Sequence, residues 1–199
     1  ANINDGSCTY IPHNDDYILS FDGLDDYIDL GINAFTSLEL EDGTIEIVLK
    51  ATESSKAILS IEGWIDISID ENGHIVAMTD GAGSKVTSSV NVLDNQYHII
   101  HILWTDSNCS IYIDGNYITN GDMNSSPDVN SHGRNSIIGN YWELLENDKY
   151  FSGNISSLSI WSRLLLEEEI STGYIENNSD ILSNYHFNAG TGNILYDHS

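Results

Sequence analysis

Residues 64–79 read Trp-Ile-Asp-Ile-Ser-Ile-Asp-Glu-Asn-Gly-His-Ile-Val-Ala-Met-Thr, and this stretch shows the clearest structural pattern in the chain. Isoleucines at 65, 67 and 69 alternate with Trp64, Asp66, Ser68 and Asp70, and a period of two is that of a β-strand. The polar residues 70–73 are typical of a hairpin turn before a second apolar run, residues 74–79. The stretch predicts a hairpin whose first strand has one face in a core and the other in solvent.

The rest of the chain repeats this pattern of short β-type runs separated by Gly, Asn, Asp and Ser. Such runs are residues 17–21, 27–30, 44–52, 97–104, 109–113 and 117–119. The run at 97–104 is apolar on both faces and is predicted to be a central strand. One helix is expected from Glu167 to about Tyr174, because three glutamates suit the positive end of a helix dipole. We therefore expect an all-β fold, an antiparallel two-sheet sandwich with one short helix, over residues 13–199, after a lead-in of residues 1–12.

Composition narrows the range of partners. The 199 residues carry 31 acidic and 6 basic side chains, for a formal net charge of −25. A chain this acidic cannot replace the counterions of phosphates, which argues against nucleic acid and anionic membranes and favours cations. No apolar run approaches the ~20 residues of a membrane span, so no membrane insertion is expected. The start of the chain has no signal-peptide pattern, and we expect an excised, monomeric module of a longer exported protein.

Five strings in the expected order resemble one family. They are residues 19–31, 44–50, 96–104 with 110–115, 151–170 and 185–197, and the resemblance spans about nine-tenths of the chain. It is a resemblance to laminin-G-like domains, which implies a concanavalin A-like jelly roll of the lectin and glucanase type. Residues 1–10, ending near Asp-Gly-Ser-Cys8, resemble the close of a Cys-bounded repeat of secreted marine bacterial multidomain proteins; an ordinary flexible terminus is the alternative. A bridge between Cys8 and Cys109 is left open.

Acidic residues concentrate around Gly23, where Asp22, Asp25 and Asp26 fall within five positions. Ca²⁺ takes six to eight hard oxygens, which acidic turns supply. The resemblance implies that the first and last strands lie side by side, which would bring Asp197 to the same turn. We expect one structural Ca²⁺ held by Asp22 and Asp197, with nearby carbonyls and Asp25 or Asp26. The alternative is that these aspartates only cap turns and solvate an edge.

Sugar recognition needs an exposed aromatic ring and fixed polar groups. Trp64, on the polar face of its strand, is one candidate. A second is the run Asn140, Tyr141 and Trp142, which follows the predicted strand at 137–139 at a loop rim. Asp80 and Asp106 could ligate a second, ligand-bridging Ca²⁺. The tryptophans at 104 and 161 are assigned to the core.

Enzyme signatures are weak in this sequence. We find no same-face pair of carboxylates of the kind that a retaining glucanase needs, and no nucleophile elbow. His98 and His101, three apart on a strand, point to opposite faces and cannot chelate one ion together. The sequence predicts a noncatalytic, calcium-stabilised, lectin-like carbohydrate-binding or adhesion module with a glycan or cell-surface ligand, outside the cell or on its surface. A protein-binding or structural spacer module is the alternative, and a glycan hydrolase a less favoured one.

Overall fold

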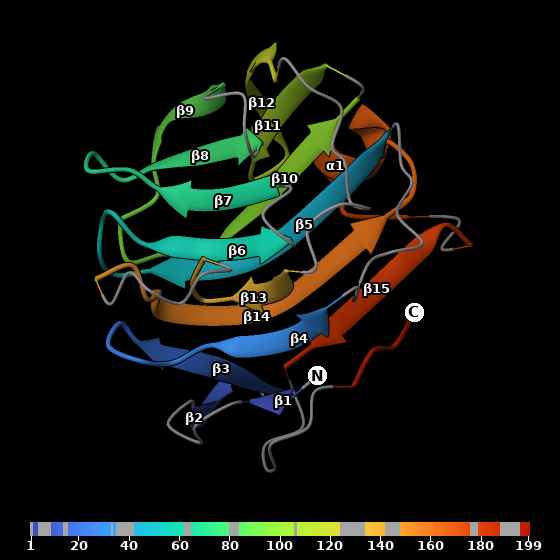
Figure 1. Cartoon of the computed structure of the whole chain (residues 1–199). Helices are drawn as coiled ribbons and strands as arrows, with labels where there is room; N and C mark the ends of the chain where they lie inside the picture. The colour runs from blue at the N-terminus through green and yellow to red at the C-terminus, as the bar shows by residue number, and fades with distance from the viewer. Residues whose placement is uncertain are drawn as a thin grey trace.

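The protein is described by a computed structural model, in which two antiparallel β-sheets face each other (Figure 1). The described residues are 2–3, 9–13, 16–32, 34, 42–61, 65–79, 84–105, 107–123, 134–141, 148–175, 179–187 and 196–199. Side chains of residues 1–17 are not among them. No helix within these ranges is long and apolar enough to cross a membrane.

The first sheet has seven strands in the order β1-β4-β13-β6-β7-β8-β9. Residues 65–79, for which the alternating pattern predicts a hairpin, form the β7–β8 hairpin of this sheet, in which Ile67 pairs with Ala77. The bounds are β1 Asn2–Ile3, β4 Ile28–Ile32, β13 Asn135–Ile138, β6 Ala57–Ile61, β7 Ile65–Ile69, β8 His74–Thr79 and β9 Lys85–Asn91.

The second sheet has eight strands, in the order β12-β11-β10-β5-β14-β3-β2, with β15 also paired to β14. The apolar strand β10 lies inside the sheet between β11 and β5, as predicted. The bounds are β12 Asn116–Asp122, β11 Asn108–Ile113, β10 His98–Trp104, β5 Gly43–Ala51, β14 Ser152–Trp161, β3 Asp16–Asp22, β2 Thr9–His13 and β15 Ile181–His186. The helix found within the described ranges, α1, is Glu167–Thr172.

The main core lies between the sheets and is built from alternate residues of each strand. In β5 these are Ile45, Ile47 and Leu49, each at most 2% exposed. Trp104 belongs to this core, as expected. A smaller cluster lies on the outer face of the eight-stranded sheet, where residues out of phase with the main core meet α1. It contains Leu103, Tyr112, Trp161, Leu165 and Ile170. The sandwich therefore has a second, local core under its helix.

Two expectations about the strands need correction. The polar face of β7 is not in solvent, because Asp66 and Ser68 are 8% and 9% exposed. β7 lies inside its sheet between β6 and β8, and alternation of polarity does not reveal what covers each face. The first and last strands are not side by side either: β3 and β15 pair one after the other along the same edge of β14.

The N-terminal residues pair with the sandwich. β1 pairs with β4, and β2 pairs with β3 from Thr9 to His13. The boundary at residue 12 thus falls inside β2, and the assignment of residues 1–12 to an upstream repeat stays a prediction. Cys109 is a free, buried thiol, and burial raises its pKa to about 12; Cys8 lies outside the described residues.

Candidate functional site

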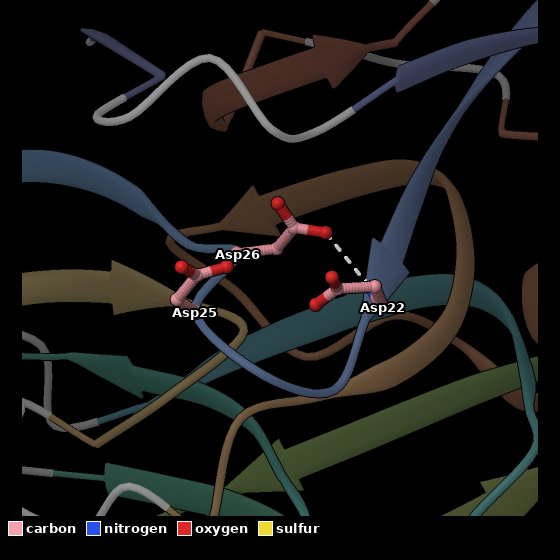
Figure 2. Close-up of side chains that lie close together, drawn as sticks. All are labelled: Asp22, Asp25 and Asp26. Carbon is pink, nitrogen blue, oxygen red and sulfur yellow. Dashed lines mark hydrogen bonds between the residues drawn. The ribbon is translucent and has the colours of Figure 1, made fainter.

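The loop between β3 and β4 brings together the three aspartates predicted to bind calcium. Figure 2 shows the carboxylates of Asp22, Asp25 and Asp26 gathered at this loop, and one oxygen of each lies within 4.8 Å of the others. Two of them also order the loop: the Asp22 N–H donates to Asp26 Oδ2 at 2.7 Å, and the Leu24 N–H to Asp22 Oδ1 at 2.8 Å. Asp26 is 1% exposed, whereas Asp22 and Asp25 are exposed. The loop both caps its own turn and presents a concentrated negative charge.

Lys56, which the sequence reasoning did not single out, fastens this loop to its surroundings. Its buried ammonium donates to the Gly23 and Asp148 carbonyls, each at 3.3 Å, and lies 3.1 Å from Glu53 Oε2. A buried lysine needs such partners, because an unpaired charge in the interior is costly. The Gly23 carbonyl is thereby engaged by an ammonium and is a poor ligand for a second cation. Only the position of Lys56 just before a strand distinguishes it in the sequence.

The second candidate segment, Asn140 and Tyr141, lies next to the acidic loop. Ile138 of β13 pairs with Ile28 of β4, and the antiparallel register carries residue 140 toward Asp26. An ideal Cβ placed on Gly139 would lie 3.1 Å from the Asp26 carbonyl oxygen. The predicted calcium loop and the predicted sugar-binding rim are therefore neighbours at one end of the sandwich.

Asn140 supports this rim from inside. It is 0% exposed, and its Oδ1 accepts the Tyr141 N–H at 2.8 Å. Its Nδ2 has no hydrogen-bond partner among the described residues. Because no part of Asn140 reaches the surface, we assign it to holding the rim, in place of the direct glycan contact expected from the sequence. Tyr141 is half-buried.

Asp197 does not join the acidic loop. Asp197 forms an isolated β-bridge with Tyr185 of β15, and Tyr185 pairs with Leu158 of β14. Asp22 instead pairs with Ser152, farther along the same strand β14. Six residues of strand separate these two positions, or about 20 Å. Asp197 Oδ1 instead accepts the Asn184 N–H at 2.8 Å and the Ser199 N–H at 2.9 Å. Burial raises the pKa of Asp197, but hydrogen bonds from the Asn184 and Ser199 N–H groups and from the Ser183 and Ser199 side chains together outweigh burial, and the net pKa is lowered.

Four predicted site residues lie outside the described residues. These are Asp80, Asp106, Trp64 and Trp142. Their roles stay predictions, and Trp142 directly follows the described rim residue Tyr141.

The histidines of β10 occupy opposite faces of the sheet, as predicted. His98 Nδ1 lies 2.8 Å from Asp114 Oδ2 and its Nε2 lies 3.1 Å from Asp94 Oδ1. His101 Nε2 lies 2.9 Å from Glu46 Oε2. Each ring is bound by carboxylates, and the two do not converge on one point.

Two facing antiparallel sheets with one short helix among the described residues place this domain in the class of jelly-roll β-sandwiches. The family model of the concanavalin A-like lectin/glucanase superfamily, Laminin_G_3, matches residues 22–171, and the chain belongs to this superfamily. The fold predicted from the sequence is thus confirmed. No curated protein sequence matches the chain.

Several solved structures share the fold. A candidate carbohydrate-binding protein from Bacteroides ovatus superposes with a TM-score of 0.70 at 17% identity, over 90% of this chain and 54% of that one, so our chain spans about half its length. The CBM40 domain of a Ruminococcus gnavus sialidase, bound to α2,3-sialyllactose, superposes with a TM-score of 0.62 at 15% identity, over 78% of this chain and 95% of that one. Domain 4 of the extracellular GH43 arabinanase AbnA from Geobacillus stearothermophilus, in complex with arabinotriose, superposes with a TM-score of 0.63 at 14% identity, over 84% of this chain and 81% of that one.

Proposed function

We propose that this domain is a noncatalytic carbohydrate-binding module. Support comes from its structural neighbours, which include domains bound to sialyllactose and to arabinotriose. A shared sandwich does not by itself confer function, so the proposal depends on the site. Such a module would act within a larger secreted or cell-surface protein, where weak single-site binding is amplified by repetition along one chain.

One observation carries the proposal: the acidic loop and the rim are adjacent at one end of the sandwich. An ideal Cβ on Gly139 would lie 3.1 Å from the Asp26 carbonyl oxygen, and in the sequence Gly139 is followed by Asn140, Tyr141 and Trp142. Sugars are recognised by aromatic rings that cover their C–H faces and by fixed polar groups that bond their hydroxyls. The rim would supply Tyr141 and Trp142, and the loop supplies the carboxylates of Asp22 and Asp26, each of which accepts a backbone N–H.

The donor chemistry of the loop suits a hard cation. Three carboxylates with oxygens within 4.8 Å of one another repel each other, and a divalent ion would offset that repulsion. Asp22, Asp25 and Asp26 would hold Ca²⁺, without Asp197 and without the Gly23 carbonyl. A bound ion would fix the loop against which the rim packs. The second ion proposed for Asp80 and Asp106 stays a separate proposal.

A glycan array probed with the labelled domain tests the proposal, once in millimolar Ca²⁺ and once in EDTA. We expect binding to one glycan class, weakened by EDTA and by Tyr141→Ala or Trp142→Ala. Tyr196→Ala is the control, because Tyr196 is 61% exposed and lies in the C-terminal segment beside β15. An array on which the domain binds nothing in either buffer would favour the spacer function.

The noncatalytic part of the proposal needs its own assay. The domain should release no reducing ends from the polysaccharide whose fragments it binds on the array. Release that disappears in Asp25→Asn would overturn the proposal and make the acidic loop a hydrolytic site.

A further inference from the structure

Two hollows border each other on the outer side of α1, away from the acidic loop. The first, about 370 Å³, lies between the β11–β12 turn and the helix and is lined by Tyr112, Gly115, Tyr117, Glu167, Glu168 and Ser171. The second, about 320 Å³, is lined by Leu166, Glu168, Glu169, Thr172 and Tyr174. Glu168 belongs to both linings, so the two hollows adjoin at this residue.

The walls of the first hollow are firmly held. The β11–β12 turn touches the helix so closely that a Cβ on Gly115 would lie 3.2 Å from Ser171 Cα. The Tyr117 ring packs edge-on against the buried Tyr112 ring, with centroids 5.4 Å apart and planes at 74°. The Tyr112 hydroxyl donates to Glu167 Oε1 at 3.4 Å. The Tyr117 ring is thus oriented by its neighbour although it is 53% exposed.

The second hollow is also lined by an exposed tyrosine and by glutamates. Tyr174, at its edge, is 71% exposed, and Glu169 is held by two 2.7 Å bonds from the Arg163 guanidinium. Within the described parts of the chain, no hydrogen bond or ion pair engages the Glu168 carboxylate. Each hollow therefore combines one exposed tyrosine ring with the shared, free acceptor between them.

We infer that these two hollows bind consecutive residues of a neutral oligosaccharide, with Tyr117 and Tyr174 against the sugar rings and Glu168 accepting hydroxyl bonds between them. A ring face takes the C–H side of a sugar and a carboxylate accepts from its hydroxyls, which is the combination present here. The choice of a sugar as ligand rests on the proposed function. The location of the hollows does not depend on the proposed function, because it differs from that of the acidic loop. In the sheet order β11, beside the first hollow, is four strands from β3, which leads into the acidic loop, or roughly 19 Å away.

The charge of the hollows selects the kind of sugar. Glu167, Glu168 and Glu169 line them on a chain of net charge −25, and Arg163, which holds Glu169, is not itself part of either lining. A sialic or uronic acid carboxylate brought here would meet like charge, which costs free energy. The site therefore excludes acidic sugars, including the sialyllactose bound by the Ruminococcus domain.

Saturation-transfer NMR and titration calorimetry with arabinotriose, xylotriose, cellotriose, mannotriose and 3′-sialyllactose test this inference. We expect one or more of the neutral trisaccharides to bind, and Tyr117→Ala, Tyr174→Ala and Glu168→Gln each to weaken that binding about tenfold or more. Tyr196→Ala, at a similarly exposed tyrosine, should change it less than twofold. Thermal melting of each variant checks folding, and Tyr174→Ala and Glu168→Gln alter exposed positions that the folded core does not use.

The outcomes separate this inference from the proposed function. Binding that is lost in Trp142→Ala but not in Tyr174→Ala or Glu168→Gln leaves the rim as the sugar site and overturns the inference. Binding lost only in the hollow variants supports the inference and moves the sugar site away from the rim. If none of the trisaccharides binds, the inference is overturned. Binding of the domain to a different glycan on the array would still support the proposed function. Preferential binding of sialyllactose at the hollows would overturn the charge argument.

Discussion

Each ring nitrogen of His98 lies within hydrogen-bond distance of a carboxylate, which makes the stability of the fold depend on pH. Burial lowers the pKa of His98, but hydrogen bonds with Asp114 and Asp94 and their charges outweigh burial, so the net pKa lies above 6.5. The stabilisation is complete below pH 6.5, where the unfolded histidine is also protonated. It is lost as the pH rises through the higher pKa of the folded state.

We predict that the free energy of unfolding of the wild type falls between pH 6 and pH 9. In His98→Gln this fall should be smaller, because the titrating group is gone. Urea unfolding at both pH values measures the difference. Asp94, Asp70 and Glu169 have lowered pKa values and stay ionised over this range, so they do not contribute to it. Parallel pH profiles for the two proteins would rule out the His98 origin.

Gly139 and Gly31 provide a matched test of packing beside the acidic loop. Their φ angles are +90° and +92°, so alanine costs each about 1–2 kcal/mol of backbone strain. A Cβ on Gly31 would meet no atom of the described residues within 4 Å, whereas one on Gly139 would lie 2.8 Å from the Phe21 ring. We expect Gly139→Ala to lose about 1–3 kcal/mol more stability than Gly31→Ala in urea unfolding. Equal losses would mean that Phe21 yields without cost.

At the scale of single elements, α1 depends on its surroundings. Six residues are too few for a stable isolated helix. Glu169 accepts the Leu166 N–H at 2.8 Å at the start of the helix and receives both bonds from Arg163. Ile170 adds the apolar contact with the cluster under the helix. The Glu169 carboxylate and the buried Ile170 side chain therefore hold the helix, together with the hydrogen bond from Tyr112 to Glu167.

This arrangement predicts the effect of removing the ion pair. Arg163→Ala should cost about 1 kcal/mol, because the pair is bidentate and partly buried, and Glu169→Ala should cost more, because it also removes the bond to Leu166. Amide hydrogen exchange should show faster exchange in α1 for both variants. A double-mutant cycle with no coupling between the two positions would contradict the ion pair as the source.

Elements were more predictable from the sequence than contacts between distant elements. The hairpin at 65–79 and the turn at Asp114–Gly115 follow from local period and turn chemistry, and both are present. Asp197 was misplaced because strand neighbours were inferred without the register along β14, and only that register separates it from Asp22. Lys56 and the burial of Asp66 depend on what covers a residue, which one sequence does not encode locally.

At the scale of the whole molecule, a net charge of −25 spread over 199 residues destabilises the compact state by self-repulsion. Salt screens this repulsion, since the Debye length falls to about 10 Å at 0.1 M. Any cation should therefore raise the melting temperature somewhat. A rise with Ca²⁺ alone does not distinguish a site from screening, and a specific site must be separated from this background.

The acidic loop makes that separation possible. We predict that millimolar Ca²⁺ raises the melting temperature above its value in EDTA by several degrees more than Mg²⁺ at equal concentration, because an ion bound only by the folded state stabilises it. Asp25→Asn and the control Glu71→Gln each remove one exposed negative charge, and both should melt slightly higher than wild type in EDTA. Only Asp25→Asn should lose the Ca²⁺-specific part. If Ca²⁺ and Mg²⁺ act equally on all three proteins, the loop is a capped turn and the cation effect belongs to the molecule's overall charge.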